Sequence, residues 1–294
     1  MQRYITPANA SLSGKVRLGL YYCQRIVTSR RVRRLANWIL LCAMRRWLRV
    51  HAMPPLASAV TAPLQREGVA NLPAMISSTE AAQMRAWLTG MPMLDSRGSG
   101  AAFTLDTVPV GCKLGDYPLE TVVNCPFVIE IANHPTVLAL AADHLGFTPT
   151  ITGLGLRWTF PSDAPPDEVQ SFHRDCELGS FKMLIYLTDV DEDAGPHTFV
   201  MASHRDRMPL RLRIYSDSEV LLSHGRGVTV LGPAGTAFAI DTRGLHKGTI
   251  PTRTPRLMLN VQYSLLPCLL FEYAPVFYSG NAIFAQYVNR LMIG

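Results

Sequence analysis

The hydrophobic residues between positions 150 and 264 fall in short runs that are rich in β-branched and aromatic side chains. The runs are Thr150–Phe160, Phe181–Leu187, His197–Met201, Gly227–Val230, Ala237–Ile240 and Leu257–Ser264. Turn-forming residues separate them, for example at Asp193–Pro196 and Gly232–Gly235. Many short strands divided by Gly and Pro turns are typical of a β-sandwich, a barrel or a jelly roll. This part of the chain therefore predicts a mainly β fold.

Two helices are expected before these strands. Ser77 followed by Glu80 is a capping-box pattern, and it predicts a helix that continues through Ala81–Leu88. A second helix is expected over His134–Leu145, because Pro135 suits the first turn of a helix. The overall fold class predicted is α+β, mainly β with flanking helices.

The segment Arg30–Val50 has the pattern of an amphipathic helix. Its basic side carries Arg30, Arg31, Arg34, Arg45, Arg46 and Arg49, and its apolar side carries Val32, Ala36, Ile39, Leu40, Ala43, Trp47 and Val50, with Arg33 as an exception. The uninterrupted apolar run, Trp38–Met44, is too short to span a bilayer. Three interpretations stay open: a helix on an anionic membrane or acidic partner, a helix packed on the protein's own body, or an Arg-rich organelle-targeting segment.

The distribution of charge also separates the N-terminal segment from the rest of the chain. Residues 1–51 contain eleven Lys or Arg and no Asp or Glu, whereas the remainder holds 17 basic and 22 acidic residues, a net charge of −5. The basic character therefore belongs to the N-terminal segment, and we expect no nucleic acid partner. His51–Pro63 is rich in Pro and Ala and predicts a linker. We expect a basic helical arm with its linker over residues 1–63 and one large domain with a C-terminal tail over 64–294.

The remaining composition fits a globular protein, with 48% hydrophobic and 17% charged residues. Its six cysteines form no CxxC pair, so we predict reduced thiols and a cytoplasmic location, with peripheral membrane association or organelle targeting left open.

Three residues form a candidate metal site. In the extended triplet around Arg174, His173 and Asp175 point to the same face, so both can bind one ion. His246 lies 71 residues after Asp175 and can complete the set from a neighbouring strand. Two imidazoles and one carboxylate on one face of an octahedron leave three positions open, as in non-haem Fe(II) oxygenases.

Those open positions suit a 2-oxo acid and O₂. A cosubstrate carboxylate far from the metal would need a planar, permanently charged partner, and Arg256 is the candidate. Alternation along the strand that Arg256 begins should place Met258 and Asn260 in the same cavity.

The ordered motifs resemble the phytanoyl-CoA dioxygenase family, which includes ectoine hydroxylases. The resemblance covers roughly residues 65–267 and rests on the Gly68–Leu88 opening, the HxD triplet, Leu184–Pro196 followed by Ser203-His204, and the distal His with an Arg ten residues on. It implies a double-stranded β-helix (jelly-roll, cupin-like) core, Fe(II), 2-oxoglutarate and O₂, and hydroxylation of a small molecule with release of succinate and CO₂.

The same resemblance assigns roles to single residues. His173, Asp175 and His246 would hold the iron, Arg256 would bind the distal carboxylate of 2-oxoglutarate, and Lys182 would contact the cosubstrate. Asp175 favours hydroxylation over halogenation, because halogenating relatives have a small residue there. A structural role is expected for the Gly195-Pro196 turn and for Ser203-His204, and a surface or loop position for His197 and His224. Asp241 either supports His246 or caps a turn.

Two other functions stay open at this point. The jelly roll could be an inactive binding module, because fold does not determine function. It could also be a cupin-type metalloenzyme that does not use 2-oxoglutarate.

Overall fold

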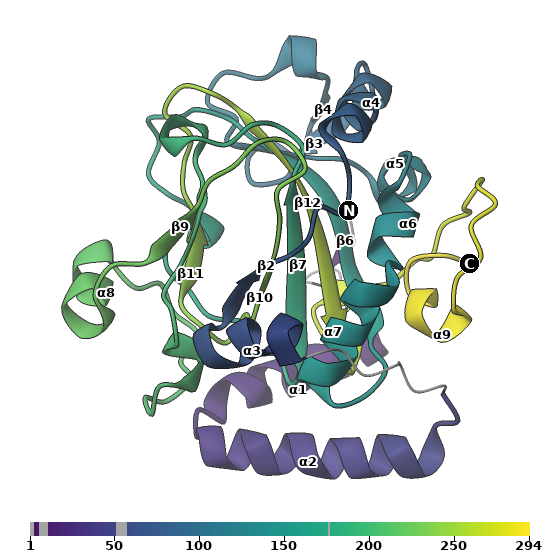
Figure 1. The fold of residues 1–294 in the computed structure, drawn as a ribbon, viewed down its shortest axis with the longest axis vertical. Helices are drawn as coiled ribbons and strands as arrows, with labels where there is room; N and C mark the ends of the chain where they lie inside the picture. Colours follow the sequence, from purple (N-terminus) through teal and green to yellow (C-terminus); the bar gives the residue numbers. More distant parts are fainter. Residues whose placement is uncertain (1–2, 6–10, 51–57, 176) are drawn as a thin grey trace.

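The computed structural model describes residues 3–5, 11–50, 58–175 and 177–294, and its centre is a jelly roll of two antiparallel sheets (Figure 1). The large sheet has the order β2 (Val69–Asn71), β10 (Ala237–Ile240), β7 (Ser180–Tyr186), β12 (Arg256–Ser264), β6 (Thr150–Thr159), β5 (Leu114–Asp116), β3 (Met93–Asp95) and β4 (Ala102–Phe103). The small sheet consists of β11 (His246–Gly248), β8 (His197–Phe199) and β9 (Val228–Val230). A separate pair joins β1 (Arg3–Tyr4) to β13 (Phe271–Glu272). The six predicted strands are confirmed, and so is the jelly-roll fold.

Alternation along β12 explains how one strand serves two layers. Leu257, Leu259 and Val261 are fully buried and face the helices, whereas Arg256, Met258 and Asn260 face the small sheet. β12 pairs with β6 on one side and β7 on the other, so its polar residues lie at the centre of the large sheet.

Helices cover the outer face of the large sheet (Figure 1). They are α4 (Ser78–Leu88), α5 (Leu119–Asn124), α6 (Val128–Ala132), α7 (Pro135–Leu145) and α9 (Gln286–Asn289), and α8 (Asp217–His224) lies on the side of the small sheet. Short 3₁₀ helices are η1 (Leu105–Thr107), η2 (Glu168–Gln170), η3 (Glu192–Ala194) and η4 (Ser203–Arg205). The predicted capping box is confirmed: the Ser77 amide donates to Glu80 Oε2 at 2.7 Å, and the Glu80 amide donates to Ser77 Oγ at 3.1 Å.

A smaller core fills the space between the two sheets. It is formed by Val69, Leu184, Tyr186, Val190, Ala194, Phe199, Val230, Phe238 and Ile240. This core fixes the distance between the sheets, and the predicted site residues lie beside it.

The predicted linker differs from the structure in part. Residues 51–57 lie outside the described residues, but Ser58–Pro63 is the first part of helix α3 (Ser58–Glu67). Leu64 of this helix is fully buried. Burial of Leu64 and the helix preference of alanine outweigh the helix-breaking tendency of Pro63, which the sequence interpretation had weighted too heavily.

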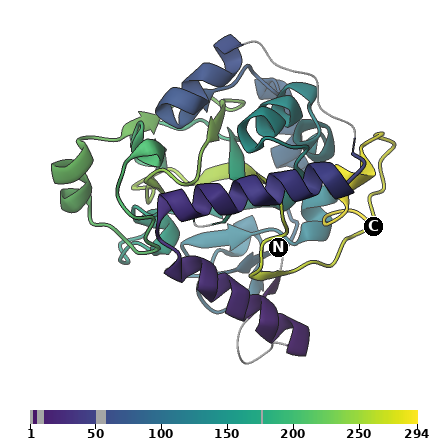
Figure 2. The ribbon, with the colours of Figure 1, turned by 90° about the horizontal axis from the view of Figure 1, so that it is seen from below.

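The arm forms two helices, α1 (Leu12–Ile26) and α2 (Arg30–Trp47), which lie side by side on the lower face of the molecule (Figure 2). The predicted helix is confirmed in α2, but only part of its predicted apolar side packs. Met44 is buried in the main core and Leu40 packs against it, whereas Val32, Ile39 and Trp47 are more than half exposed. Arg33 is buried as well. In the described part of the chain, no helix is both long and apolar enough to cross a membrane.

Candidate active site

The three predicted metal ligands converge. Their ligand atoms lie within 4.8 Å of one another, and the ring centroids of His173 and His246 are 4.3 Å apart. The cause is a short antiparallel bridge, in which the His173 amide donates to the His246 carbonyl at 3.0 Å and the His246 amide donates back at 3.1 Å. The Asp175 amide donates to the Thr242 carbonyl at 2.9 Å, so the whole triplet is held beside the loop before β11.

Both imidazoles are oriented through the nitrogen that faces away from the cluster. His173 Nδ1 lies 2.8 Å from the Ser171 carbonyl, and His246 Nδ1 lies 3.0 Å from the Gly244 carbonyl. A carbonyl can only accept, so Nδ1 carries the proton in each ring and Nε2 keeps its lone pair for a metal.

The electrostatics set the protonation states that a metal requires. Burial, followed by the neighbouring His173 imidazole, lowers the pKa of His246 to about 3. Burial raises the pKa of Asp175, whereas the ammonium of Lys182 and the two histidines lower it. The lowering is the larger effect, so the pKa of Asp175 lies below its ordinary value. At neutral pH the site therefore offers a neutral His246 and an ionised Asp175.

Arg174, the middle residue of the triplet, points away from the cluster and fixes the loops around it. Its guanidinium is buried and donates to the Ser203 carbonyl and the Arg243 carbonyl, both at 2.7 Å, and to Asp206. Ser203 Oγ in turn accepts from the Leu245 amide at 2.8 Å. The structural role expected for Ser203 agrees with this contact, which positions the residue before His246.

A cavity of about 90 Å³ lies between the sheets, beside the metal-ligand cluster. Its lining includes His173 and His246 on one side and Arg256, Met258 and Asn260 on the other, as the alternation predicted. Arg256 is buried, and its Nε and Nη1 have no hydrogen-bond partner among the described residues. Two unpaired N–H donors in a buried guanidinium are costly unless an anion such as a carboxylate binds them. These residues therefore fit Fe(II) and 2-oxoglutarate.

Lys182 lies in the same cavity but contacts a ligand residue. Its Nζ donates to Asp175 Oδ2 at 2.6 Å. Its side chain also lines the cavity that Arg256 lines. The contact to the cosubstrate that the resemblance implied stays a prediction.

His197 was wrongly expected on the surface. It lies on β8, is only 5% exposed, lines the cavity, and its ring centroid is 5.7 Å from that of His246. Burial lowers its pKa well below the usual value, and its Nε2 has no hydrogen-bond partner in the described structure. The strand expected from residue 197 onward was the available signal, but the sequence did not show which face of that strand points inward.

The other residues singled out in the sequence have structural contacts. Asp241 accepts from the Arg243 amide at 2.9 Å and lies 3.3 Å from His144 Nε2, which agrees with the turn-capping interpretation. Gly195 has a φ of +68°, and a Cβ there would lie 2.5 Å from the Pro251 backbone nitrogen, so the turn requires glycine. His224 Nε2 lies 3.1 Å from Asp206, away from the metal-ligand cluster.

A second cavity, of about 170 Å³, adjoins the first and shares with it Arg157, Val169, Lys182, Met258 and Asn260. Its wall is polar and apolar in about equal parts, and its polar residues include Asp116 and Gln262. Gly153 and Gly155 of β6 keep it open, and a Cβ at Gly155 would meet no atom within 4 Å.

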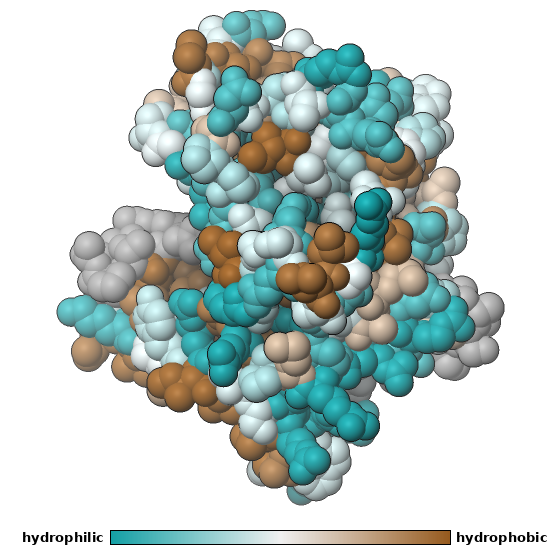
Figure 3. All heavy atoms as spheres, turned by 90° about the vertical axis from the view of Figure 1, so that its left-hand side faces the viewer, coloured by the Kyte–Doolittle hydropathy of each residue, from teal (hydrophilic) through white to brown (hydrophobic). Residues whose placement is uncertain are grey.

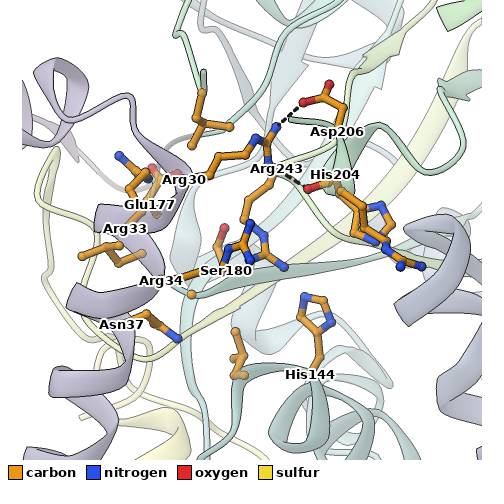
Figure 4. Close-up of a pocket in the computed structure, with 15 residues that line it drawn as sticks. Arg30, Arg33, Arg34, Asn37, His144, Glu177, Ser180, His204, Asp206 and Arg243 are labelled. Atoms are coloured by element: carbon orange, nitrogen blue, oxygen red, sulfur yellow. Dashed lines mark hydrogen bonds and ion pairs between the residues drawn. The ribbon is translucent and has the colours of Figure 1, made fainter. Parts of the chain in front are cut away.

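A larger cavity, of about 410 Å³, lies between α2 and the body (Figure 4). It contains none of the three predicted ligands, and its arginines are largely engaged. Arg30, for example, donates to the His204 carbonyl at 2.7 Å and pairs with Asp206 at 3.1 Å, and Arg243 pairs with Asp241. Size alone would select this cavity, but the chemistry lies in the smaller one.

Solved structures share this fold. The α-ketoglutarate-dependent epimerase SnoN from nogalamycin biosynthesis is 22% identical, with a TM-score of 0.52 and coverage of 70% of this chain and 82% of that protein. HygX from Streptomyces hygroscopicus, solved with nickel and 2-oxoglutarate bound, is 14% identical, with a TM-score of 0.51 over 81% of this chain and 100% of HygX. EctD from S. alaskensis, in its apo form, is 19% identical, with a TM-score of 0.51 over 76% and 86%. At these identities the likeness shows a shared fold.

The family is established by sequence. No curated protein matches the chain, but residues 64–255 match the family described as phytanoyl-CoA dioxygenase (PhyH), which is more than half of the 294 residues. The resemblance inferred from the motifs is thereby confirmed, and the chain belongs to the phytanoyl-CoA dioxygenase family of Fe(II)- and 2-oxoglutarate-dependent oxygenases.

Proposed function

We propose that this protein is a dioxygenase that hydroxylates, or otherwise oxidises, an unactivated C–H bond of a small molecule, with release of succinate and CO₂. One observation carries the proposal: the two histidines of a His-Asp-His cluster and the buried Arg256, with two unpaired N–H groups, line one cavity. A metal chelated by a 2-oxo acid needs both the His-Asp-His cluster and a cation such as Arg256 for the distal carboxylate. A structural metal site needs only the cluster.

Each residue has a defined task in this proposal. His173 and His246 would bind Fe(II) through Nε2, and Asp175 would bind it through its carboxylate. When bound, Fe(II) with 2-oxoglutarate and O₂ supplies the oxidation of the C–H bond, and the protein supplies orientation and exclusion of water. Arg256 would hold the distal carboxylate of 2-oxoglutarate through Nε and Nη1.

Lys182 has two tasks in the proposal. Its ammonium keeps Asp175 ionised, since it donates to Oδ2 at 2.6 Å. It also lines the cavity between the cluster and Arg256, where it can donate to a cosubstrate carboxylate. The carboxylate at position 175 favours hydroxylation over halogenation, because it keeps the position that a halide would otherwise take.

The substrate is proposed to enter the adjoining cavity. The two cavities measure about 90 and 170 Å³, below the roughly 300 Å³ at which drug-sized pockets begin, so the substrate should be small. The shared wall contains the Asn260 amide, whose Oδ1 has no partner among the described residues. We therefore expect a substrate with a hydrogen-bonding polar group.

The test is succinate formation from 2-oxoglutarate with the purified protein, Fe(II) and a panel of small polar metabolites. Iron-dependent succinate release that one metabolite stimulates, with one oxygen atom gained by that metabolite, would support the proposal. Loss of two hydrogens instead would indicate desaturation or ring closure by the same site.

The two alternatives predict different results. A cupin-type metalloenzyme would bind the metal and turn over without 2-oxoglutarate, and Arg256→Ala would change little. An inactive binding module would bind neither Fe(II) nor 2-oxoglutarate. Either result would contradict the proposed function.

A further inference from the structure

Helices α1 and α2 turn hydrophobic side chains toward solvent. Twelve of the 24 large hydrophobic residues that are exposed in the described part of the chain lie between Ser11 and Val50, so this short segment is unlike the rest of the surface. They are Leu12, Val16, Leu20, Tyr22, Ile26, Val27, Val32, Leu35, Trp38, Ile39, Trp47 and Leu48. Figure 3 shows hydrophobic side chains among hydrophilic ones in the lower part of the molecule, where the arm lies. Exposed hydrophobic residues that gather on one segment point to a binding site for a partner or a membrane.

The spacing of these residues makes two stripes. On α1, Leu12, Val16 and Leu20 recur every four residues, and on α2, Val32, Leu35 and Ile39 recur at three and four. The two helices are joined at their ends, because Arg33 donates to the Gln24 carbonyl at 2.8 Å and to the Val27 carbonyl at 3.1 Å. The stripes therefore lie on two connected helices, and we call these exposed apolar residues together the outer face.

The outer face is fixed by contacts on the opposite side of each helix. In α2, Arg30 donates to the His204 carbonyl at 2.7 Å (Figure 4). It also donates to the Met208 carbonyl at 2.8 Å. In α1, Arg17 donates to the Cys268 carbonyl at 3.1 Å. Apolar contacts add to this anchoring, because Leu18 and Met44 are buried and Leu40 and Leu41 pack against the main core. The exposed apolar residues of both helices take no part in these contacts.

Positive charge surrounds the outer face. Arg31, Arg46 and Arg49 are exposed, and no carboxylate in the described part of the chain forms an ion pair with them. Arg34 instead lines the cavity between α2 and the body (Figure 4). Residues 1–51 contain no Asp or Glu at all. An exposed apolar stripe with arginines and tryptophans but without acidic groups is the composition of a helix that lies in a membrane interface.

A second copy of the chain fits this face poorly. A symmetric dimer through it would bring the arginines of one subunit against those of the other, and like charges in contact are unfavourable. Anionic phospholipid satisfies both the charge and the apolar stripe.

We propose that the outer face of α1 and α2 binds the surface of a bilayer that contains anionic phospholipid. The helices lie parallel to the membrane, with Trp38, Ile39 and Leu35 among the acyl chains and the arginines at the phosphates. This inference does not depend on the proposed enzymatic function.

The test is vesicle flotation with the full chain. Wild-type protein should float with vesicles of phosphatidylcholine and phosphatidylglycerol and stay behind with phosphatidylcholine alone. Raising NaCl from about 0.1 M to about 1 M shortens the Debye length from about 10 Å to about 3 Å and should reduce binding. Changing Arg31, Arg46 or Arg49 to Gln, one at a time, should weaken binding about fivefold in each variant.

The matched variants compare two exposed apolar pairs. Leu35→Ser with Trp38→Ser should abolish flotation, whereas Leu221→Ser with Leu222→Ser, on α8, should leave it unchanged; those α8 side chains are 52% and 89% exposed. Unchanged circular dichroism would show that both variants fold. Equal flotation of the two variants would overturn the proposal. So would wild-type protein that ignores anionic vesicles at low salt, or a dimer in solution that only the α2 variant dissociates.

Discussion

The jelly-roll body and the N-terminal arm use hydrophobic and basic residues in opposite ways. In the body, alternation along β12 buries Leu257 and Leu259 and turns Arg256 into a cavity. In the arm, Arg33 is buried and Trp38 is 62% exposed. A buried arginine with unpaired donors, such as Arg256, indicates that an anionic ligand binds there. Exposed apolar residues on an anchored helix, such as Trp38, indicate that this surface binds a partner or a membrane.

The difference shows what an amphipathic pattern can establish. An amphipathic pattern distinguishes the two sides of a helix or strand. It does not show which side packs against the rest of the protein. In a sheet the neighbouring strands decide this, since β6 and β7 flank β12 on both edges. In a helix that contacts the body along one side only, a few polar contacts such as those of Arg30 can decide it instead.

The largest effect is expected for a metal ligand in the body. Asp175→Ala should reduce 2-oxoglutarate turnover by more than about 100-fold, because residues that only support metal ligands already cost about 10- to 100-fold. Succinate release measures this. The matched control is Asp163→Ala, an exposed carboxylate in the preceding loop, which should keep full activity. Flotation with anionic vesicles should be unchanged in both variants; if Asp175→Ala kept wild-type turnover, the ligand assignment would be wrong.

Arg256→Ala should weaken 2-oxoglutarate binding on the order of 100-fold, since two charge-assisted hydrogen bonds each contribute about 1.5–3 kcal/mol. Fe(II) affinity should stay near wild type, because Arg256 lies across the cavity from the ligands. Calorimetric titration under anaerobic conditions measures both. Arg256→Lys keeps the charge but loses the planar guanidinium with its paired donors. Its 2-oxoglutarate affinity should lie between those of the wild type and Arg256→Ala. Equal 2-oxoglutarate affinity in all three proteins would remove Arg256 from the cosubstrate site.

Gly155→Val should act on the substrate alone. The added side chain would meet no protein atom within 4 Å at Cβ and would project into the adjoining cavity, and valine suits a strand. We expect KM for the stimulating metabolite to rise at least about tenfold, because a filled pocket excludes the ligand. 2-Oxoglutarate affinity should not change. Gly155→Ala should show a smaller effect in the same direction, and wild-type kinetics in both variants would place the substrate elsewhere.

The smallest effect concerns the joint between body and arm. Asp206 pairs with Arg30 of α2 at 3.1 Å, with Arg174 and with His224. Burial raises the pKa of Asp206, but these neighbours lower it by more than burial raises it. The folded-state pKa therefore lies below the ordinary 3.8. Its contribution is therefore present above pH 3.8 and lost as the pH falls through the folded-state value.

Asp206→Asn should cost about 1–3 kcal/mol of unfolding free energy at neutral pH, from the loss of charge-assisted hydrogen bonds. Urea unfolding at a series of pH values measures the difference from wild type. The difference should shrink as the pH falls below 3.8. A difference that is constant with pH would show that the carboxylate charge does not anchor the arm.

Sequence reasoning reached the strands, the cluster and the arginine because each depends on local pattern. The bridge that joins His173 to His246 follows from an HxD triplet beside a strand, and Arg256 follows from alternation. It missed His197, because whether a short strand turns its first residue in or out depends on the pairing of β8 with β9 and β11. It also missed the contact of Lys182 with Asp175, which depends on the packing of two sheets.

The central claim is most directly tested by visible absorption of the protein under anaerobic conditions. Addition of 2-oxoglutarate to the Fe(II)-loaded wild-type protein should produce the weak charge-transfer band of a chelated 2-oxo acid. The band should be absent in Asp175→Ala and should require far more 2-oxoglutarate in Arg256→Ala. A wild-type protein that binds Fe(II) and gives no band at saturating 2-oxoglutarate would contradict the account.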